Sequence, residues 1–233
     1  MKVDIVTFRD GVRAVVGFDY QKRDQDERPM VLDVLLQAQA TTMPDLAFRY
    51  GCRARNCGVC TVDINGKPRV SCRARAREGD TISAVATLPV VGDLVARRDG
   101  VARQLRGRLP ATDEQTNLNV EAPDDYHALT ACIECYACLD KCPMHERNQS
   151  EPEADPAAGF RWGNPFSLLK LQRVRLDPLS SVENREAVLE HAIDLGLDAC
   201  VDCAGCKCGI GIDLKRKVVA ELVSAAGDRL PQG

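Results

Sequence analysis

Residues 132–143 read CIECYACLDKCP, a run in which cysteines are spaced C-x2-C-x2-C-x3-C and followed by proline. In this spacing the first three cysteines bind one 4Fe-4S cluster and the fourth ligates the other cluster of a pair. Two further groups of four cysteines lie on either side of the run; they are Cys52, Cys57, Cys60, Cys72 and Cys200, Cys203, Cys206, Cys208. The 12 cysteines therefore match the ligand count of three iron-sulfur clusters and indicate electron transfer.

The first group matches the plant-type 2Fe-2S pattern, because Cys52-x4-Cys57-x2-Cys60 is completed by the more distant Cys72. A Rieske centre would need two histidine ligands. All three histidines lie outside this group; they are His127, His145 and His191. A zinc site is the alternative, since Cys57-x2-Cys60 alone is typical of zinc knuckles. Zinc does not account for the fixed position of Cys52, so all-thiolate ligation of a 2Fe-2S cluster is the better prediction.

The other two groups are expected to exchange ligands, because the fourth cysteine of such a run reaches across to the other cluster. One 4Fe-4S cluster is then predicted to bind Cys132, Cys135, Cys138 and Cys208, and the other Cys142, Cys200, Cys203 and Cys206. Only one residue separates Cys206 from Cys208, an irregular spacing that leaves the choice between these two open. A zinc clip or buried free thiols are the alternatives for the last group.

The hydrophobic pattern predicts an α+β fold with two domains, residues 1–105 and residues 106–233. Asp10-Gly11 and Asn65-Gly66 each separate two β-like runs, which is a strong hairpin signal. Apolar residues at helical spacing follow residue 31 and recur through the second half of the chain, which we expect to be helical. Residues 148–159, NQSEPEADPAAG, lack apolar periodicity and are predicted to form an exposed connection.

Composition and charge exclude several classes of partner. The net charge is −3 and aromatic residues make up 4% of the chain, so neither phosphate attraction nor base stacking favours nucleic acid as a partner. Asp4 and Arg9 interrupt the region where a signal peptide would be apolar, and we expect a cytoplasmic protein. Membrane contact, if there is any, is expected through another subunit. A reducing cytoplasm disfavours disulfides and favours metal ligation by these cysteines.

Several motifs resemble the iron-sulfur subunit of succinate dehydrogenases and fumarate reductases. They are LAFRYGCR at 46–53, Cys57-Gly58-x-Cys60, NGKPR at 65–69 before Cys72, PVVGDLV at 89–95, and the run from Cys132 to Pro143. The resemblance implies an N-terminal β-grasp 2Fe-2S ferredoxin-like domain that docks on a flavoprotein carrying FAD. It further implies an α-helical, bacterial-ferredoxin-like domain that faces the electron acceptor, a quinone or another group, through a possible membrane-anchor subunit.

The chain departs from that family at positions that bear on its acceptor. Cys203 fills a place where the family usually lacks a cysteine and has a 3Fe-4S cluster, so a second 4Fe-4S cluster is predicted here. Met144 and His145 stand where the family often has a tryptophan pair, and Val201 stands in place of a histidine. Arg55 replaces a glycine of the cluster loop. Ubiquinone reduction in the usual pocket is therefore in question.

The function expected from these patterns is that of a non-catalytic electron-transfer subunit in a succinate dehydrogenase or fumarate reductase-like oxidoreductase. Two alternatives stay open: an electron-transfer subunit of a different flavoenzyme, acting on 2-hydroxyacids or acyl compounds, and a zinc-stabilised interaction module. His145 and Glu146 could relay protons but are expected to be simply exposed. Two arginine clusters are expected to be solvated faces, with docking of a partner as the alternative; they are Arg69, Arg73, Arg75, Arg77 and Arg97, Arg98, Arg103, Arg106, Arg108.

Overall fold

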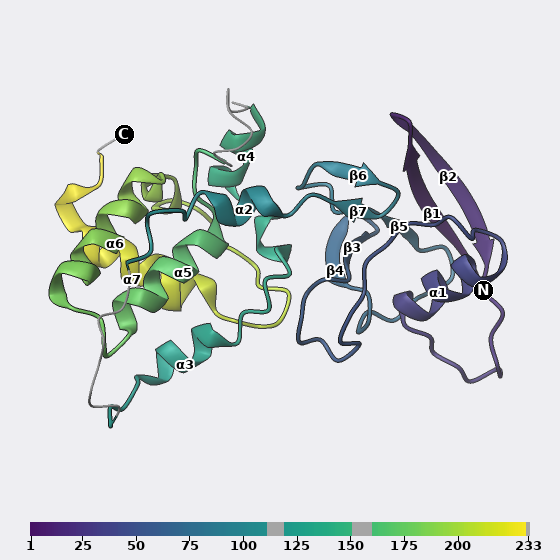
Figure 1. The fold of residues 1–233 in the computed structure, drawn as a ribbon, viewed down its shortest axis with the longest axis horizontal. Helices are drawn as coiled ribbons and strands as arrows, with labels where there is room; N and C mark the ends of the chain where they lie inside the picture. Colours follow the sequence, from purple (N-terminus) through teal and green to yellow (C-terminus); the bar gives the residue numbers. More distant parts are fainter. Residues whose placement is uncertain (111–118, 151–159, 232–233) are drawn as a thin grey trace. The chain divides into compact units, whose positions relative to one another are not determined.

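The computed structural model describes residues 1–110, 119–150 and 160–231. The chain divides into two units. The first comprises Met1–Arg98 and Ile133–Ala137, and the second comprises Asp99–Cys132 and Cys138–Gly233 (Figure 1). The first unit thus takes in a short piece of the second cysteine run. The expected α+β class is confirmed, since the first unit contains a sheet and the second is built from helices.

The first unit contains a five-stranded mixed sheet in the order β2-β1-β5-β3-β4. Its strands are β1 (Lys2–Arg9), β2 (Val12–Asp19), β3 (Thr61–Ile64), β4 (Lys67–Val70) and β5 (Thr81–Ser83). The β1–β5 pair is parallel, and the other three pairs are antiparallel. A separate two-stranded sheet is formed by β6 (Val90–Gly92) and β7 (Val95–Ala96).

Both predicted hairpin turns are present. Asp10 and Gly11 have φ values of 50° and 77°, and Asn65 and Gly66 have φ values of 52° and 71°. Positive φ at both central residues gives a turn whose twist matches that of the two strands it joins. The turns connect β1 to β2 and β3 to β4, so local sequence sets the register of both pairs.

One helix, α1 (Val31–Thr41), covers this sheet and closes the core of the first unit (Figure 1). Val31, Val34 and Leu35 are fully buried and pack in one cluster with Ile5 and Ile82 of the sheet. These helix positions recur at the spacing of one helical face, as the sequence predicts. The core of the first unit therefore forms between a β-sheet and a single crossing helix.

The second unit is helical. Its α-helices are α2 (Asp99–Arg103), α3 (Asp124–Thr130), α4 (Pro143–Ser150), α5 (Pro165–Leu176), α6 (Val182–Asp194) and α7 (Glu221–Ala226). A π-helical segment, η3 (Lys215–Ala220), precedes α7, and 3-10 turns lie at η1 (Ala137–Leu139), η2 (Leu197–Cys200) and η4 (Gly227–Arg229). Helices α5 and α6 pack against each other (Figure 1). Leu168 and Leu171 of α5, Val188 of α6 and Leu222 of α7 are fully buried.

The prediction of an exposed connection at 148–159 is wrong for its first three residues, which form the last turn of α4. Asn148 is buried, and its side chain donates to the carbonyl oxygen of Trp162 at 2.9 Å and accepts from the N–H of Trp162 at 2.7 Å. The spacing of apolar residues in the sequence does not predict this pairing of Asn148 with Trp162. Residues 151–159 lie outside the described part of the chain. No helix among the described residues combines the length and apolar character that a membrane crossing requires.

Candidate metal centres

The loop that carries the first three cysteines is shaped to stabilise negative charge on sulfur. Arg53 and Arg55 adopt left-handed backbone conformations, with φ values of 55° and 61°. The N–H groups of Ala54 and Asn56 both point at the Sγ atom of Cys52, at 3.3 Å each. Successive N–H groups in a turn that contains left-handed residues form a concave anion-binding nest. The donor set fits a thiolate-bound iron-sulfur cluster, which carries negative charge on its sulfurs.

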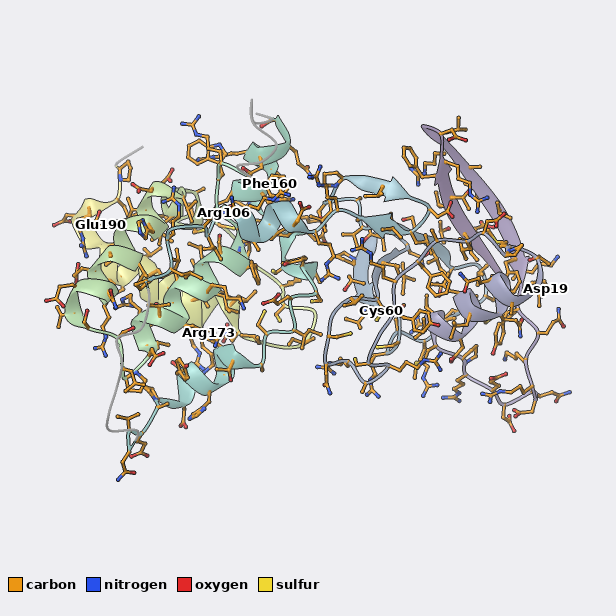
Figure 2. The ribbon with its side chains drawn as sticks, in the orientation of Figure 1. Asp19, Cys60, Arg106, Phe160, Arg173 and Glu190 are labelled. Atoms are coloured by element: carbon orange, nitrogen blue, oxygen red, sulfur yellow. The ribbon has the colours of Figure 1, made fainter. Side chains whose placement is uncertain are left out.

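The four thiols of the first group influence one another. Hydrogen bonds from the N–H groups of Ala54 and Asn56, followed by one from the Cys57 side chain, lower the pKa of Cys52 to about 7. Burial raises the pKa of Cys72, and interactions with Cys60 and with the charge of Cys52 raise this pKa further. Cys60 directly precedes β3 (Figure 2). Cys60 is buried, whereas Cys52 is exposed. The fold therefore brings the loop cysteines to Cys72 at the edge of the sheet.

A second group forms in the helical unit from Cys142 and the last cysteine run. Burial, followed by the charges of Cys142, Cys206 and Cys203, raises the pKa of Cys200 to about 12. Burial and the charges of Cys142 and Cys203 raise the pKa of Cys206 to about 12. Burial also raises the pKa of Cys142 to about 11, with Cys203 contributing. These four thiols are close enough for their charges to interact, and their assignment to one cluster stays a prediction.

The surroundings of this second group combine a cation with soft, apolar contacts. Lys215 donates from Nζ to the carbonyl oxygen of Cys203 at 2.7 Å, and its charge lowers the pKa values of Cys200 and Cys206. The N–H of Gly205 donates to the Sγ atom of Cys203 at 3.4 Å. Met144 is fully buried, and its sulfur lies 3.4 Å from the Sγ atom of Cys200. The positive charge and the donated N–H both favour thiolates over thiols.

The residue after Met144 corrects a prediction. The sequence predicts that His145 is exposed, yet only 1% of its surface is accessible. Its ring packs edge-on against Phe160, with the centroids 5.1 Å apart. Sequence reasoning missed this because the polar run that follows Cys142 lies on α4, which turns His145 into the second unit while Glu146 stays exposed.

The four remaining predicted ligands are divided between the two units. Cys135 is buried in the first unit, in a cluster with Leu32, Cys60, Cys72 and Ala137. In the second unit the other three are partly buried; they are Cys132, Cys138 and Cys208. The assignment of Cys208 to the cluster of Cys132, Cys135 and Cys138 stays a prediction.

In the part of the chain that the structure describes, no three His, Cys, Asp or Glu side chains converge as ligands of one metal ion. A structural zinc ion needs four such ligands around one point, each at about 2.0 to 2.3 Å. Cysteines that bind a cluster are divided among several iron atoms, so they need no common centre.

The two arginine clusters differ in exposure. The first behaves as predicted for a solvated face, because none of its four members is buried; they are Arg69, Arg73, Arg75 and Arg77. In the second cluster Arg97 is exposed but Arg98 is partly buried, and its guanidinium bonds to backbone carbonyl groups of two cysteine-bearing loops. No signal in the sequence distinguishes Arg98 from its neighbour.

Comparison with known proteins matches the first part of the chain to an iron-sulfur domain. Residues 5–103 match the family described as 2Fe-2S iron-sulfur cluster binding domain. Over 88% of its length the chain is 27% identical to one of the fumarate reductase (CoM/CoB) subunits of Methanothermobacter marburgensis, and covers 40% of that protein. Over 64% of its length it is 26% identical to the fumarate reductase iron-sulfur subunit of Escherichia coli, and covers 65% of it. The chain is also similar to the succinate dehydrogenase iron-sulfur subunit of Paracoccus denitrificans, at 31% identity over 58% of this chain and 56% of that protein.

A likeness in fold to one solved structure extends over nearly the whole chain. A chain of the structure titled Mycobacterium smegmatis Sdh1 complex in the apo form superposes with a TM-score of 0.78 at 24% identity, covering 98% of this chain and 95% of that one. The matching domain family and the similar sequences confirm the resemblance inferred from the cysteine motifs, and the structural match confirms the fold. The chain spans less than two thirds of the length of the first two curated relatives that it matches.

Proposed function

We propose that the chain is the electron-transfer subunit of a succinate dehydrogenase or fumarate reductase-like oxidoreductase. It would pass electrons between a FAD-containing flavoprotein subunit and a quinone or another acceptor. The observation that carries this proposal is the grouping of cysteine thiols from separate runs, with backbone N–H groups aimed at Cys52. No catalytic site of its own is proposed for the chain, and the partner would supply the substrate chemistry.

Two of the proposed ligand sets take thiols that interact within one unit, and the third takes cysteines from both units. The 2Fe-2S cluster would be bound by Cys52, Cys57, Cys60 and Cys72, and one 4Fe-4S cluster by Cys142, Cys200, Cys203 and Cys206. A further 4Fe-4S cluster would be bound by Cys132, Cys135, Cys138 and Cys208. When bound, such clusters supply one-electron redox chemistry.

The residues of the chain act on the thiolates. In the first unit the N–H groups of Ala54 and Asn56 donate to Cys52 and stabilise its charged form. In the second unit Lys215 contributes positive charge beside Cys200 and Cys206, and Cys200 is buried away from water while Cys206 is partly buried. Hydrogen bonds, charge and burial are the means by which a protein sets the reduction potential of a cluster.

Metal and sulfide analysis of anaerobically purified protein tests the proposal. Three clusters of the proposed types require about ten irons and ten sulfides per chain. Replacing Cys72 by serine is expected to remove the EPR signal of the reduced 2Fe-2S cluster and leave the 4Fe-4S signals in place. Replacing Cys203 by serine is expected to convert one 4Fe-4S cluster to a three-iron form, visible by EPR in the oxidised protein. A colourless protein that contains zinc would contradict the proposal.

A different flavoenzyme partner is the second candidate, favoured by the surroundings of Cys200. Met144 is buried with its sulfur against Cys200, and Val201, the residue after Cys200, is exposed. Met144 and Val201 stand at two positions where the motif comparison implies quinone-site residues. The partner would then oxidise 2-hydroxyacids or acyl compounds. Isolation of the native complex and identification of the flavoprotein that accompanies this chain distinguishes the two candidates.

A further inference from the structure

Arg98 joins two backbone segments that are far apart in sequence. Within the first unit its guanidinium donates to the carbonyl oxygen of Gly58 at 3.0 Å and, through the other terminal nitrogen, to the carbonyl oxygen of Glu134. The guanidinium also lies over the ring of Tyr136, 4.8 Å from the centroid. These contacts of Arg98 with Gly58, Glu134 and Tyr136 are called the Arg98 bridge below.

Both segments carry proposed cluster ligands. Gly58 directly follows Cys57 in the loop of the first cysteine group, and Glu134 directly precedes Cys135 in the second run. The Arg98 bridge therefore links the loop proposed to bind the 2Fe-2S cluster with a loop proposed to bind a 4Fe-4S cluster. Glu134 has a φ of 54°, so its carbonyl group is presented by a backbone turn that most residues avoid.

The two loops touch through their backbones. A Cβ atom added to Gly58 would lie 2.3 Å from the carbonyl oxygen of Ile133 and 2.8 Å from the backbone nitrogen of Cys135. Gly58 also has a φ of 61°, which favours glycine. No other residue type fits this position without moving one loop away from the other. The contact is thus as close as a polypeptide backbone allows.

The chemistry of arginine suits this place. Its planar guanidinium donates in several fixed directions at once, which lets one side chain serve two carbonyl groups and stack on a ring. Burial lowers the pKa of Arg98, but a guanidinium keeps its charge at physiological pH. The two carbonyl oxygens and the Tyr136 ring compensate for the lost hydration. A lysine would bring the charge without the fork.

We propose that Arg98 is a positioning residue that keeps the two cluster loops in contact, so that electrons pass between the first two clusters across the junction of Gly58 and Cys135. The proposal rests on the proposed function, because it takes both loops to be cluster-binding. It deepens that function by naming the side chain that maintains the junction, in addition to the cysteines.

Three variants of the full chain test this role. Arg98→Lys keeps the charge but loses the fork, and Arg98→Met loses both. Arg97→Met is the matched control, since it removes an exposed arginine one residue away. Iron and sulfide content is measured first for each. Hydrogen exchange of the amides at 57–61 and 133–137 then reports on the junction, and EPR of the fully reduced protein reports on magnetic interaction between the two clusters.

Arg98→Lys and Arg98→Met are both expected to speed amide exchange in these two segments about tenfold, which is the effect of losing one charge-assisted hydrogen bond of roughly 1.4 kcal/mol. The magnetic broadening of the 2Fe-2S signal is expected to weaken in both. The midpoint potential of the 2Fe-2S cluster is expected to fall only in Arg98→Met, because Arg98→Lys keeps the positive charge beside the loop and solvent screens the charge of the exposed Arg97. Arg97→Met is expected to match the wild type in all three measurements.

The proposal is overturned if Arg98→Lys retains wild-type exchange and magnetic broadening, or if Arg97→Met produces the same changes. It is also overturned if exchange rises but the broadening does not change, because the bridge would then stabilise the loops without serving the clusters. A wild-type chain without iron and sulfide refutes the proposed function itself, and the initial metal analysis reveals that before any variant is compared.

Discussion

At the scale of single residues, the proposed cysteine ligands differ greatly in acidity. Backbone N–H groups lower the pKa of Cys52 to about 7, while burial raises the pKa values of Cys200 and Cys206 to about 12. Only thiolates bind iron, so the ligands in the second unit must release protons when metal binds. The first unit, in contrast, presents a thiolate at neutral pH before any metal arrives.

Alkylation of the metal-free protein is expected to follow this difference. Cys52 should react first with iodoacetamide because it is exposed and its pKa is lowered to about 7, and its rate should level off as the pH rises through about 7. Cys200 and Cys206 should react slowest at every pH below about 11. Mass spectrometry of peptides after timed reaction measures the order, and reaction in denaturant provides the control in which the three rates converge.

Asp93 is a second residue whose chemistry depends on the fold. Its carboxylate accepts from Arg9 at 3.1 and 3.2 Å and from the N–H groups of Ala47 and Phe8 at 2.9 and 3.3 Å. Burial raises its pKa, but these bonds outweigh burial and hold the pKa below its usual range. Asp93→Asn is expected to lower the free energy of unfolding by about 1 to 3 kcal/mol at pH 7, measured by urea denaturation.

The pH dependence of that loss has a definite sign. A carboxyl group with a lowered folded pKa stabilises fully above its unfolded value of about 3.9, and this contribution disappears as the pH falls through the folded pKa. The difference between wild type and Asp93→Asn should therefore narrow only in acid. Asp45→Asn removes an exposed carboxylate near Arg9 and should change stability by less than about 0.5 kcal/mol. A similar loss in both variants would contradict this account.

Sequence reasoning identified the cysteines but not the residues that support them. Ligand spacing is local, so the loop of Cys52, Cys57 and Cys60 can be read directly from the chain. Asp93, by comparison, bonds to Phe8 and Ala47, which lie 85 and 46 positions away. Nothing near a residue in the sequence indicates partners of that kind, and the same holds for Arg98.

At the scale of single elements, helix α5 begins with a buried capping box. The Asn164 side chain accepts from the N–H groups of Phe166 and Ser167 at 3.0 Å each, and the Ser167 hydroxyl accepts from the N–H of Asn164 at 2.8 Å. Asn164 and Ser167 are both fully buried. If the Asn164 side chain were removed, water could not reach these N–H groups to replace it as acceptor. The cap therefore contributes more to the free energy of unfolding than a cap on the surface does.

Asn164→Ala is accordingly expected to destabilise the protein by about 2 kcal/mol, the upper end of the range for cap removal. Urea unfolding followed by far-UV circular dichroism measures it. Ser181→Ala removes the N-cap of α6, where the hydroxyl accepts from Asn184 at 3.1 Å in a partly buried place, and should cost about 1 kcal/mol or less. Equal losses in the two variants would show that burial of the Asn164 cap adds nothing.

Elements defined by local chemistry were predictable, and those defined by tertiary contacts were not. Asp10-Gly11 and Asn65-Gly66 specify their turns through the conformations that these residues favour, and the sequence predicts both hairpins. The last turn of α4 was missed because Asn148 is buried by its pairing with the backbone of Trp162. The polar sequence from residue 148 on reads as a loop until that partner is known.

At the scale of the whole molecule, the two units are expected to respond differently to loss of metal. The main core of the first unit contains no cysteine among its buried residues, which include Ile5, Leu35 and Ile82. In the second unit the segment 201–211 is largely without helix or strand and carries three of the proposed ligands. Metal binding contributes folding energy where the ligands have little other structure to order them.

Chelation of iron is therefore expected to raise amide exchange in residues 201–211 at least tenfold, a change of about 1.4 kcal/mol in opening free energy. Exchange in β1 and α1 should stay close to that of the metal-loaded protein. Hydrogen-exchange mass spectrometry before chelation, after it, and after reconstitution with iron and sulfide provides the comparison. Equal increases across β1, α1 and residues 201–211 would contradict the independence of the first core.

The placement of Ile133–Ala137 in the first unit has a consequence for biosynthesis. Cys135 and Ala137 cover Leu32 and Val70, so the N-terminal unit lacks part of its own apolar packing until residue 137 has left the ribosome. During that interval the nascent chain exposes this surface, and it is then most vulnerable to aggregation. A fragment ending at Arg98 would lack this five-residue segment and keep the same surface exposed permanently.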